Sequence, residues 1–376
     1  MLPALYRYVY NLSFFFWSVF LLARGLSGAQ VGVVLAVNTI VSLLMSLPSG
    51  LLHDRYEAKN VFLVGLGLQM VFLVSLFWVR DFGFLVLLFL VAGVAHRLIE
   101  VSLDGYSIKA HQDNAGQKIL DYFLLFRFTG IALGILTSSF LIGGELLDWI
   151  LVANLIGVVI LAMLSFFLPK ISAVDLTTEI SKQSFADPKV YFFLIGLFVF
   201  ALHFGAEAVS YVPFLTTWLG LEGVEVGLYM ALPILCMGVG SFYFNRIIGT
   251  KVASGYFLVF GLLASGVFHV LMVNTDVWLS LLFRTLHELG DAAVFTFMYR
   301  GLTDLFAGHR VGNILGVVSL NMTLAASVSA LFYGYLIDHY AITAPLVVSG
   351  FLGAILAIII LFVLVGFKQL RNALFY

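Results

Sequence analysis

The sequence predicts an all-α membrane protein of twelve transmembrane helices in two pseudo-symmetric six-helix bundles. Three observations predict this class: an extreme hydrophobic composition, apolar runs that recur along the chain, and an internal repeat. Of the 376 residues, 62% are hydrophobic and only 10% are charged. A water-soluble fold of this size cannot bury so much apolar surface. A helix needs roughly 20 apolar residues to cross a bilayer, and the sequence supplies such runs repeatedly.

The apolar runs fall into two groups of six, separated by a polar segment. The first six lie near residues 8–23, 29–52, 60–79, 83–105, 119–143 and 147–168, and predict an N-terminal bundle over 1–168. Residues 169–189 are rich in charged and hydroxyl side chains and predict a cytoplasmic linker. Six further runs lie near 191–218, 224–248, 253–274, 277–300, 312–336 and 343–367, and predict a C-terminal bundle over 190–376.

The distribution of basic residues predicts the orientation of the chain. Lys and Arg accumulate in the short cytoplasmic loops of membrane proteins. With both termini inside, only Arg24 and Arg80 of the 19 basic residues fall in the opposite loops, while Arg97, Arg127 and Arg284 lie within predicted spans. We therefore expect a multi-pass protein of the inner (cytoplasmic) membrane with both termini cytoplasmic. The first run lacks a small-residue cleavage site, so we also expect the N-terminus to be retained.

The two halves of the sequence share a short internal repeat. The segment Gly25–Gly32 recurs as Gly220–Gly227, with Gly, Leu, Gly, Val and Gly at matching places. Each copy joins the first and second predicted helices of its half. Six-helix repeats in parallel orientation imply a pseudo-twofold axis along the membrane normal, with a binding site where the halves meet.

The loop after the second predicted helix carries a recognisable motif. It begins at Gly50, continues through Asp54 and Arg55, and ends at Lys59. This segment resembles the cytoplasmic loop signature of the major facilitator superfamily, from which it departs at the two positions before Lys59. The resemblance implies that the loop stabilises one conformation of a rocking transport cycle. Physically, Asp54 is favoured at a helix N-terminus, and the basic residues can meet anionic lipid headgroups.

A second resemblance lies in the fourth predicted helix. Family members have an intramembrane Arg followed three residues later by Gln and then Gly; here Arg97 is followed by Glu100 and Val101. The resemblance implies a role in proton transfer for Arg97 alone. The Gly-Pro antiporter signature of the fifth helix is not recovered, since Gly130 and Gly134 lack a following proline. This absence weakens the assignment of a drug antiporter.

Ionisable residues recur within the predicted spans. Each one costs about 2.5–3.5 kcal/mol at the bilayer centre, so each needs a partner, water or a function. Arg97, Glu100 and Asp104 are spaced to share one helical face, and the tenth helix repeats this device. The resemblance implies that the first, fourth, seventh and tenth helices line the cavity. The candidate substrate and proton cavity comprises Arg97, Glu100, Arg127, His203, Glu207, Arg284, His287, Glu288 and Asp291.

Two interpretations of these buried residues remain open. They could be interhelical ion pairs that only lock helices together, or a functional set in which Glu207, Glu288 and His287 exchange protons. We expect no metal site, because the histidines lie on different helices and would have to converge in space. Cys236 is the single cysteine, which excludes an intramolecular disulfide and a cysteine-based zinc site.

The function that these features predict is secondary active transport of a small organic solute by alternating access, coupled to protons. Efflux of amphipathic compounds by proton antiport is an alternative, and an intramembrane enzyme or a non-transporting sensor are others. The sequence contains no His-Glu-x-x-His, Gly-x-Ser-x-Gly or phosphate-binding-loop motif. With a net charge of −1 and no basic block, no nucleic-acid partner is expected. We expect a monomer without a cofactor; the substrate and the direction of transport stay open.

Overall fold

A computed structural model of the chain describes residues 2–14, 17–110, 118–142, 147–168, 188–247, 254–305 and 311–366. Every regular element within these ranges is a helix, so the predicted all-α class is confirmed. Of the predicted linker, residues 169–187 lie outside the described residues.

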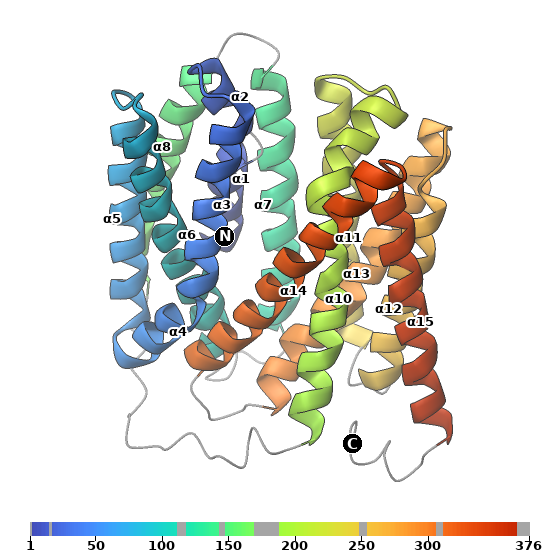
Figure 1. Cartoon of the computed structure of the whole chain (residues 1–376). Helices are drawn as coiled ribbons and strands as arrows, with labels where there is room; N and C mark the ends of the chain where they lie inside the picture. Colours follow the sequence, from blue (N-terminus) through green and yellow to red (C-terminus); the bar gives the residue numbers. More distant parts are fainter. Residues whose placement is uncertain are drawn as a thin grey trace. The chain divides into compact units, whose positions relative to one another are not determined.

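The first half of the chain forms the helices that the apolar runs predict (Figure 1). The first run is a pair of helices, and the second is a pair bent by 45°. The helices are α1 (Leu2–Phe14), α2 (Trp17–Ala23), α3 (Gly28–Leu44), α4 (Ser46–Arg55), α5 (Ala58–Leu76), α6 (Phe82–Ala110), α7 (Lys118–Ile142) and α8 (Leu147–Ser165).

The second half follows the same plan. Its helices are α10 (Pro188–Pro213), the π-helix η2 (Phe214–Trp218), α11 (Val224–Ile247), α12 (Ser254–Leu271), α13 (Val277–Leu305), α14 (Val311–His339) and α15 (Ala344–Gly366). Among the described residues, seven helices are long and apolar enough to cross a membrane, or eight if the bent pair α3–α4 is one span. Each of the twelve predicted runs corresponds to one helix or one consecutive pair of helices.

The helices belong to two compact units. Unit 1 comprises Met1–Ala115, Thr129–Glu179 and His309–Leu320, and unit 2 comprises Gly116–Phe128, Ile180–Gly308 and Asn321–Tyr376. In unit 1, α5 packs against α6 and α8, and α3 packs against α6. In unit 2, α12 packs against α13 and α15, and α11 packs against α13. The predicted division into 1–168 and 190–376 stays a prediction.

Glycines allow the helices of unit 2 to approach closely. A Cβ atom on Gly266 of α12 would clash with the backbone of Gly350 and Ala354 on α15. A Cβ atom on Gly290 of α13 would clash with the backbone of Ser265 on α12. Small residues give this kind of close contact between membrane helices. The approach of α12 to α13 brings the polar side chains of the two helices within reach of one another.

Replacing Gly266 by alanine is expected to destabilise the protein by about 1–3 kcal/mol, because the added methyl group meets backbone that cannot move aside. A Cβ atom added to Gly334 on α14 would meet no other atom within 4 Å, so Gly334 serves as the matched control. Gly334→Ala should be neutral or stabilising, since alanine is the better helix former. Thermal unfolding in detergent compares the two variants; equal melting temperatures would contradict the close-packing interpretation.

The internal repeat is recovered in the backbone. Gly25 and Gly220 both adopt positive φ angles, of 88° and 69°, a conformation that favours glycine. Two residues after each glycine, the same hydrogen bond recurs. The Ser27 N–H donates to Gln30 Oε1 over 3.0 Å, and the N–H at the matching position of the second copy donates to the Glu225 carboxylate over 3.2 Å. The two copies therefore form similar turns.

Candidate functional site

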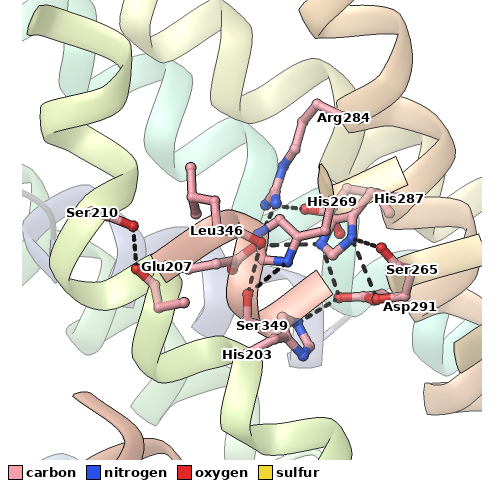
Figure 2. Close-up of polar contacts among 12 residues, drawn as sticks. His203, Glu207, Ser210, Ser265, His269, Arg284, His287, Asp291, Leu346 and Ser349 are labelled. Atoms are coloured by element: carbon pink, nitrogen blue, oxygen red, sulfur yellow. Dashed lines mark hydrogen bonds and ion pairs between the residues drawn. The ribbon is translucent and has the colours of Figure 1, made fainter. Parts of the chain in front are cut away.

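Unit 2 buries a cluster of ionisable side chains from three helices, shown in Figure 2. We call it the unit 2 cluster; its members are His203 and Glu207 of α10, His269 of α12, and Arg284, His287, Glu288 and Asp291 of α13. Its α13 residues lie on one side of that helix because they are spaced three or four positions apart. The Glu207 side chain is 20% exposed, whereas the other six residues are buried.

Two carboxylates share one guanidinium in this cluster. Arg284 donates hydrogen bonds to both Glu207 and Glu288. The guanidinium carbon also lies 4.4 Å from the centre of the Tyr211 ring, a favourable cation–π position. Arg284 neutralises one unit of charge, so the second carboxylate needs a proton or another cation nearby.

Three imidazole rings lie beside these carboxylates. His203 Nε2 is 3.1 Å from Asp291 Oδ2, and His287 Nε2 is 3.7 Å from the same oxygen. His287 Nε2 is also 3.3 Å from Glu207 Oε1. The rings of His269 and His287 are 4.4 Å apart between centres. His203, His269 and His287 therefore converge in space, whereas His96 lies in unit 1.

Unit 1 holds a smaller cluster on α1 and α6, in which Arg7 and Arg97 are buried and His96 and Glu100 are partly buried. Glu100 accepts hydrogen bonds from both Arg7 and Arg97, the latter over 3.0 Å. Arg97 Nε also donates to the Ser42 carbonyl over 3.1 Å. Among the ion pairs described for this cluster, two guanidiniums share one carboxylate, whereas in unit 2 two carboxylates share one guanidinium.

Aromatic side chains of α1 cover His96. The Tyr10 ring stacks on the imidazole with 4.0 Å between ring centres, and the Tyr6 hydroxyl lies 2.6 Å from His96 Nδ1. His96 Nε2 is in turn 3.5 Å from Glu100 Oε2. His96 is therefore packed between the rings of α1 and the Glu100 side chain.

The loop motif meets the start of α14. Asp54 accepts hydrogen bonds from the backbone N–H groups of Gly312 (3.0 Å) and Asn313 (2.7 Å). Asp54 thus lies at a helix N-terminus, as its charge predicts. Gly50 lacks a side chain where one would clash with the Gly312 carbonyl. Lys59 donates to the Phe166 carbonyl over 2.9 Å.

Replacing Asp54 by asparagine is expected to cost about 1–2 kcal/mol of stability, because it removes a charge held by two backbone N–H groups. Asp338→Asn is the matched control, since Asp338 lies on the exposed side of α14. Chemical unfolding of both variants in mixed micelles measures the difference. A loss no larger than in the control would show that the motif carboxylate contributes nothing through this contact.

The structure places some candidate residues away from the clusters and adds others. Arg127 lies with its guanidinium carbon 6.0 Å from the Tyr299 ring centre. Arg7 precedes the first predicted span, which begins near residue 8, but the structure places it in α1 with its side chain buried. His269 was missed because it stands in an apolar run with no charged residue within four positions. Only the packing of α12 against α13 brings it to His287.

Comparisons with known proteins agree with this architecture. The sequence profile of the Major Facilitator Superfamily matches residues 4–255 and 193–372. The chain therefore belongs to the Major Facilitator Superfamily. Its members are multi-pass membrane transporters rather than enzymes. No sequence match was found among curated proteins.

Solved structures share the fold at low sequence identity. The human organic anion transporter MFSD10 (TETRAN) is 13% identical with a TM-score of 0.75, over 96% of this chain and 97% of that one. The E. coli fucose:proton symporter FucP is 12% identical with a TM-score of 0.72, over 96% and 97%. The proton:xylose symporter XylE is 14% identical with a TM-score of 0.73, over 98% and 94%.

Proposed function

We propose that this transporter moves a small organic solute across the inner (cytoplasmic) membrane by alternating access, coupled to protons. It works as a monomer with both termini in the cytoplasm. Glu207, Glu288 and Arg284 of the unit 2 cluster couple the proton to the solute. Arg97 and Glu100 of unit 1 belong to the cavity that accepts the solute.

The observation that carries this proposal is the sharing of Arg284 by two carboxylates. Because the two carboxylates share the single positive charge of Arg284, that charge cannot neutralise both of them. Burial of a carboxylate that is not fully neutralised favours its uptake of a proton. When one carboxylate takes up a proton, Arg284 pairs with the other one. The position of the Arg284 side chain therefore depends on which carboxylate carries the proton. Two of the proteins with a similar fold are named as proton symporters, which supports the same mode of coupling.

The test is solute-dependent proton flux in proteoliposomes that contain a trapped pH-sensitive dye. A panel of hexoses, organic acids, amino acids and amphipathic cations is offered under an imposed pH gradient of either direction. The wild type should move protons with one class of solute, and the direction of flux separates uptake from efflux.

The variants Glu207→Gln and Glu288→Gln should lose gradient-driven accumulation of that solute, because neither amide can carry the proton. Glu222→Gln, an exposed residue of the turn before α11, should transport like the wild type. Accumulation at wild-type rates in both cluster variants would contradict the proposed proton site. A wild-type protein that moves none of the panel in either direction would contradict transport itself.

A further inference from the structure

The hydrogen bonds of the three histidines in the unit 2 cluster fix which ring nitrogen faces the carboxylates. His203 Nδ1 contacts the Phe200 carbonyl over 2.5 Å, and His287 Nδ1 contacts the Ser265 carbonyl over 2.8 Å. A carbonyl only accepts, so each Nδ1 must carry a proton and donate it. In a neutral ring, Nε2 then presents its lone pair.

His269 follows the same rule through a hydroxyl group. Its Nδ1 lies 3.2 Å from Ser349 Oγ, and that hydroxyl donates its own proton to the Leu346 carbonyl over 3.1 Å. The hydroxyl oxygen is therefore the acceptor for His269 Nδ1–H. The Nε2 atom of each of the three rings lies within 4.0 Å of a carboxylate oxygen of the cluster, and Figure 2 shows the three rings together. Histidines that bind metals are oriented in this way, by donation from the opposite nitrogen.

The atoms that these rings face are acceptors as well. His203 Nε2 lies 3.1 Å from Asp291 Oδ2, so when the ring is neutral a lone pair faces a carboxylate oxygen, and this contact needs a proton or a metal ion between the two atoms. Among the described residues, His287 Nε2 and Asp291 Oδ1 are buried without a hydrogen-bond partner. Buried polar atoms without partners are costly. A cation between the rings and the carboxylate satisfies all of them.

The charge of the cluster points to the same ligand. When Glu207, Glu288 and Asp291 are all ionised and the histidines are neutral, three negative charges face the one positive charge of Arg284, which leaves an excess of two negative charges. Arg284 is occupied by the two glutamates. Asp291 meets only imidazole rings among the ion pairs described. One divalent cation beside Asp291 would balance the cluster.

The spacing of the donor atoms fits a tetrahedral ion. Zinc–ligand distances of about 2.0–2.1 Å place neighbouring donors of a tetrahedron about 3.3–3.4 Å apart. The two contacts of Asp291 Oδ2, with His203 Nε2 at 3.1 Å and with His287 Nε2 at 3.7 Å, bracket that value. The donor atoms of His203, His287 and Asp291 all lie within 4.8 Å of one another. His269 groups with Glu207 and His287 instead.

We propose that His203, His287 and Asp291 bind one divalent transition-metal ion of the zinc and cobalt class, with the fourth position open. Two imidazoles favour such an ion over magnesium or calcium, which prefer oxygen ligands throughout. The ion enters past Glu207, whose carboxylate is the exposed edge of the cluster and lies 3.3 Å from His287 Nε2. The site goes beyond the proposed proton-coupled transport of an organic solute.

The test uses the purified full chain in detergent, carrying an affinity tag without histidine and stripped with a chelator. Co²⁺ is titrated while the visible absorption of tetrahedral cobalt is recorded, and bound metal is counted by mass spectrometry. The wild type should bind one Co²⁺ per chain, and Zn²⁺ should displace it. Absence of saturable binding of either ion would overturn the proposal.

The variants His203→Gln, His287→Gln and Asp291→Asn should each weaken binding by at least about a hundredfold, because loss of an outer-shell partner alone costs about 10–100-fold. His96→Gln in unit 1 and the exposed His339→Gln are controls and should bind like the wild type. Melting temperature and gel filtration identify variants that fail to fold, and the remaining ligand variants then decide. Binding that survives all ligand variants, or falls equally in the controls, would overturn the site.

No solute or gradient enters this titration. A chain that binds no metal leaves the transport proposal standing, and a chain that transports nothing leaves the metal site standing. The two proposals therefore fail separately.

Discussion

Replacement of Arg284 by methionine is expected to destabilise the protein by about 3–5 kcal/mol and to abolish transport. The guanidinium is buried and donates to Glu207 and Glu288. Its removal leaves both carboxylates without their cation, and an uncompensated buried charge is one of the costliest defects in a folded protein. Denaturation by SDS in mixed micelles measures the stability, and proteoliposome flux measures the transport.

A compensated variant separates the structural role of Arg284 from its functional role. Combining Arg284→Met with Glu207→Gln and Glu288→Gln removes the cation together with the two carboxylates that it serves. Stability should recover most of the loss, because similar uncharged side chains replace the ion pairs. Transport should stay absent. A compensated variant that transports would show that this trio only locks helices together.

The second large effect is expected in unit 1. Glu100→Gln removes the carboxylate that Arg7 and Arg97 share and leaves two buried guanidiniums without it. The expected loss is again about 3–5 kcal/mol, because both cations lose the carboxylate that they share. The exposed Glu222→Gln should change stability by less than about 0.5 kcal/mol.

The same denaturation assay measures this effect. Adding Arg7→Met to Glu100→Gln should restore part of the stability, since one cation fewer is left buried. If Glu100→Gln were as stable as the Glu222→Gln control, the carboxylate shared by Arg7 and Arg97 would contribute nothing to the free energy of unfolding. The account of paired charges in unit 1 would then be wrong.

The features that follow from helical periodicity could be predicted from the sequence. Arg284, Glu288 and Asp291 share a face because their spacing is that of an α-helix, and the structure places them in one cluster. The twelve apolar runs likewise gave the helices, because length and hydropathy alone decide what can cross a bilayer. Asp54 at a helix N-terminus was predictable from its charge.

The features that depend on packing between helices could not be predicted in this way. His269 has no charged neighbour at helical spacing, and it joins the cluster because Gly290 lets α13 approach α12. Arg7 precedes the first apolar run, as a basic residue of a cytoplasmic segment would. Its burial depends on pairing with Glu100 of α6, which is distant in the sequence. The orientation of the imidazole rings depends on carbonyl groups that sequence spacing does not place.

Alternating access of the unit 2 cluster is the central claim, and a single cysteine tests it most directly. Cys236 is the only native cysteine and is exposed. Cys236→Ser therefore gives a cysteine-free protein that a thiol reagent does not label. Ser210 is buried one turn from Glu207, with its hydroxyl bonded to the Ala206 carbonyl. Ser210→Cys is a small change at that place.

The measurement is the labelling of Ser210→Cys by a membrane-impermeant thiol reagent, added to either face of proteoliposomes with one protein orientation. We expect modification from both faces, with the accessible face changing when the transported solute is present in excess. Labelling from one face only, or from neither, would contradict alternating access at this cluster.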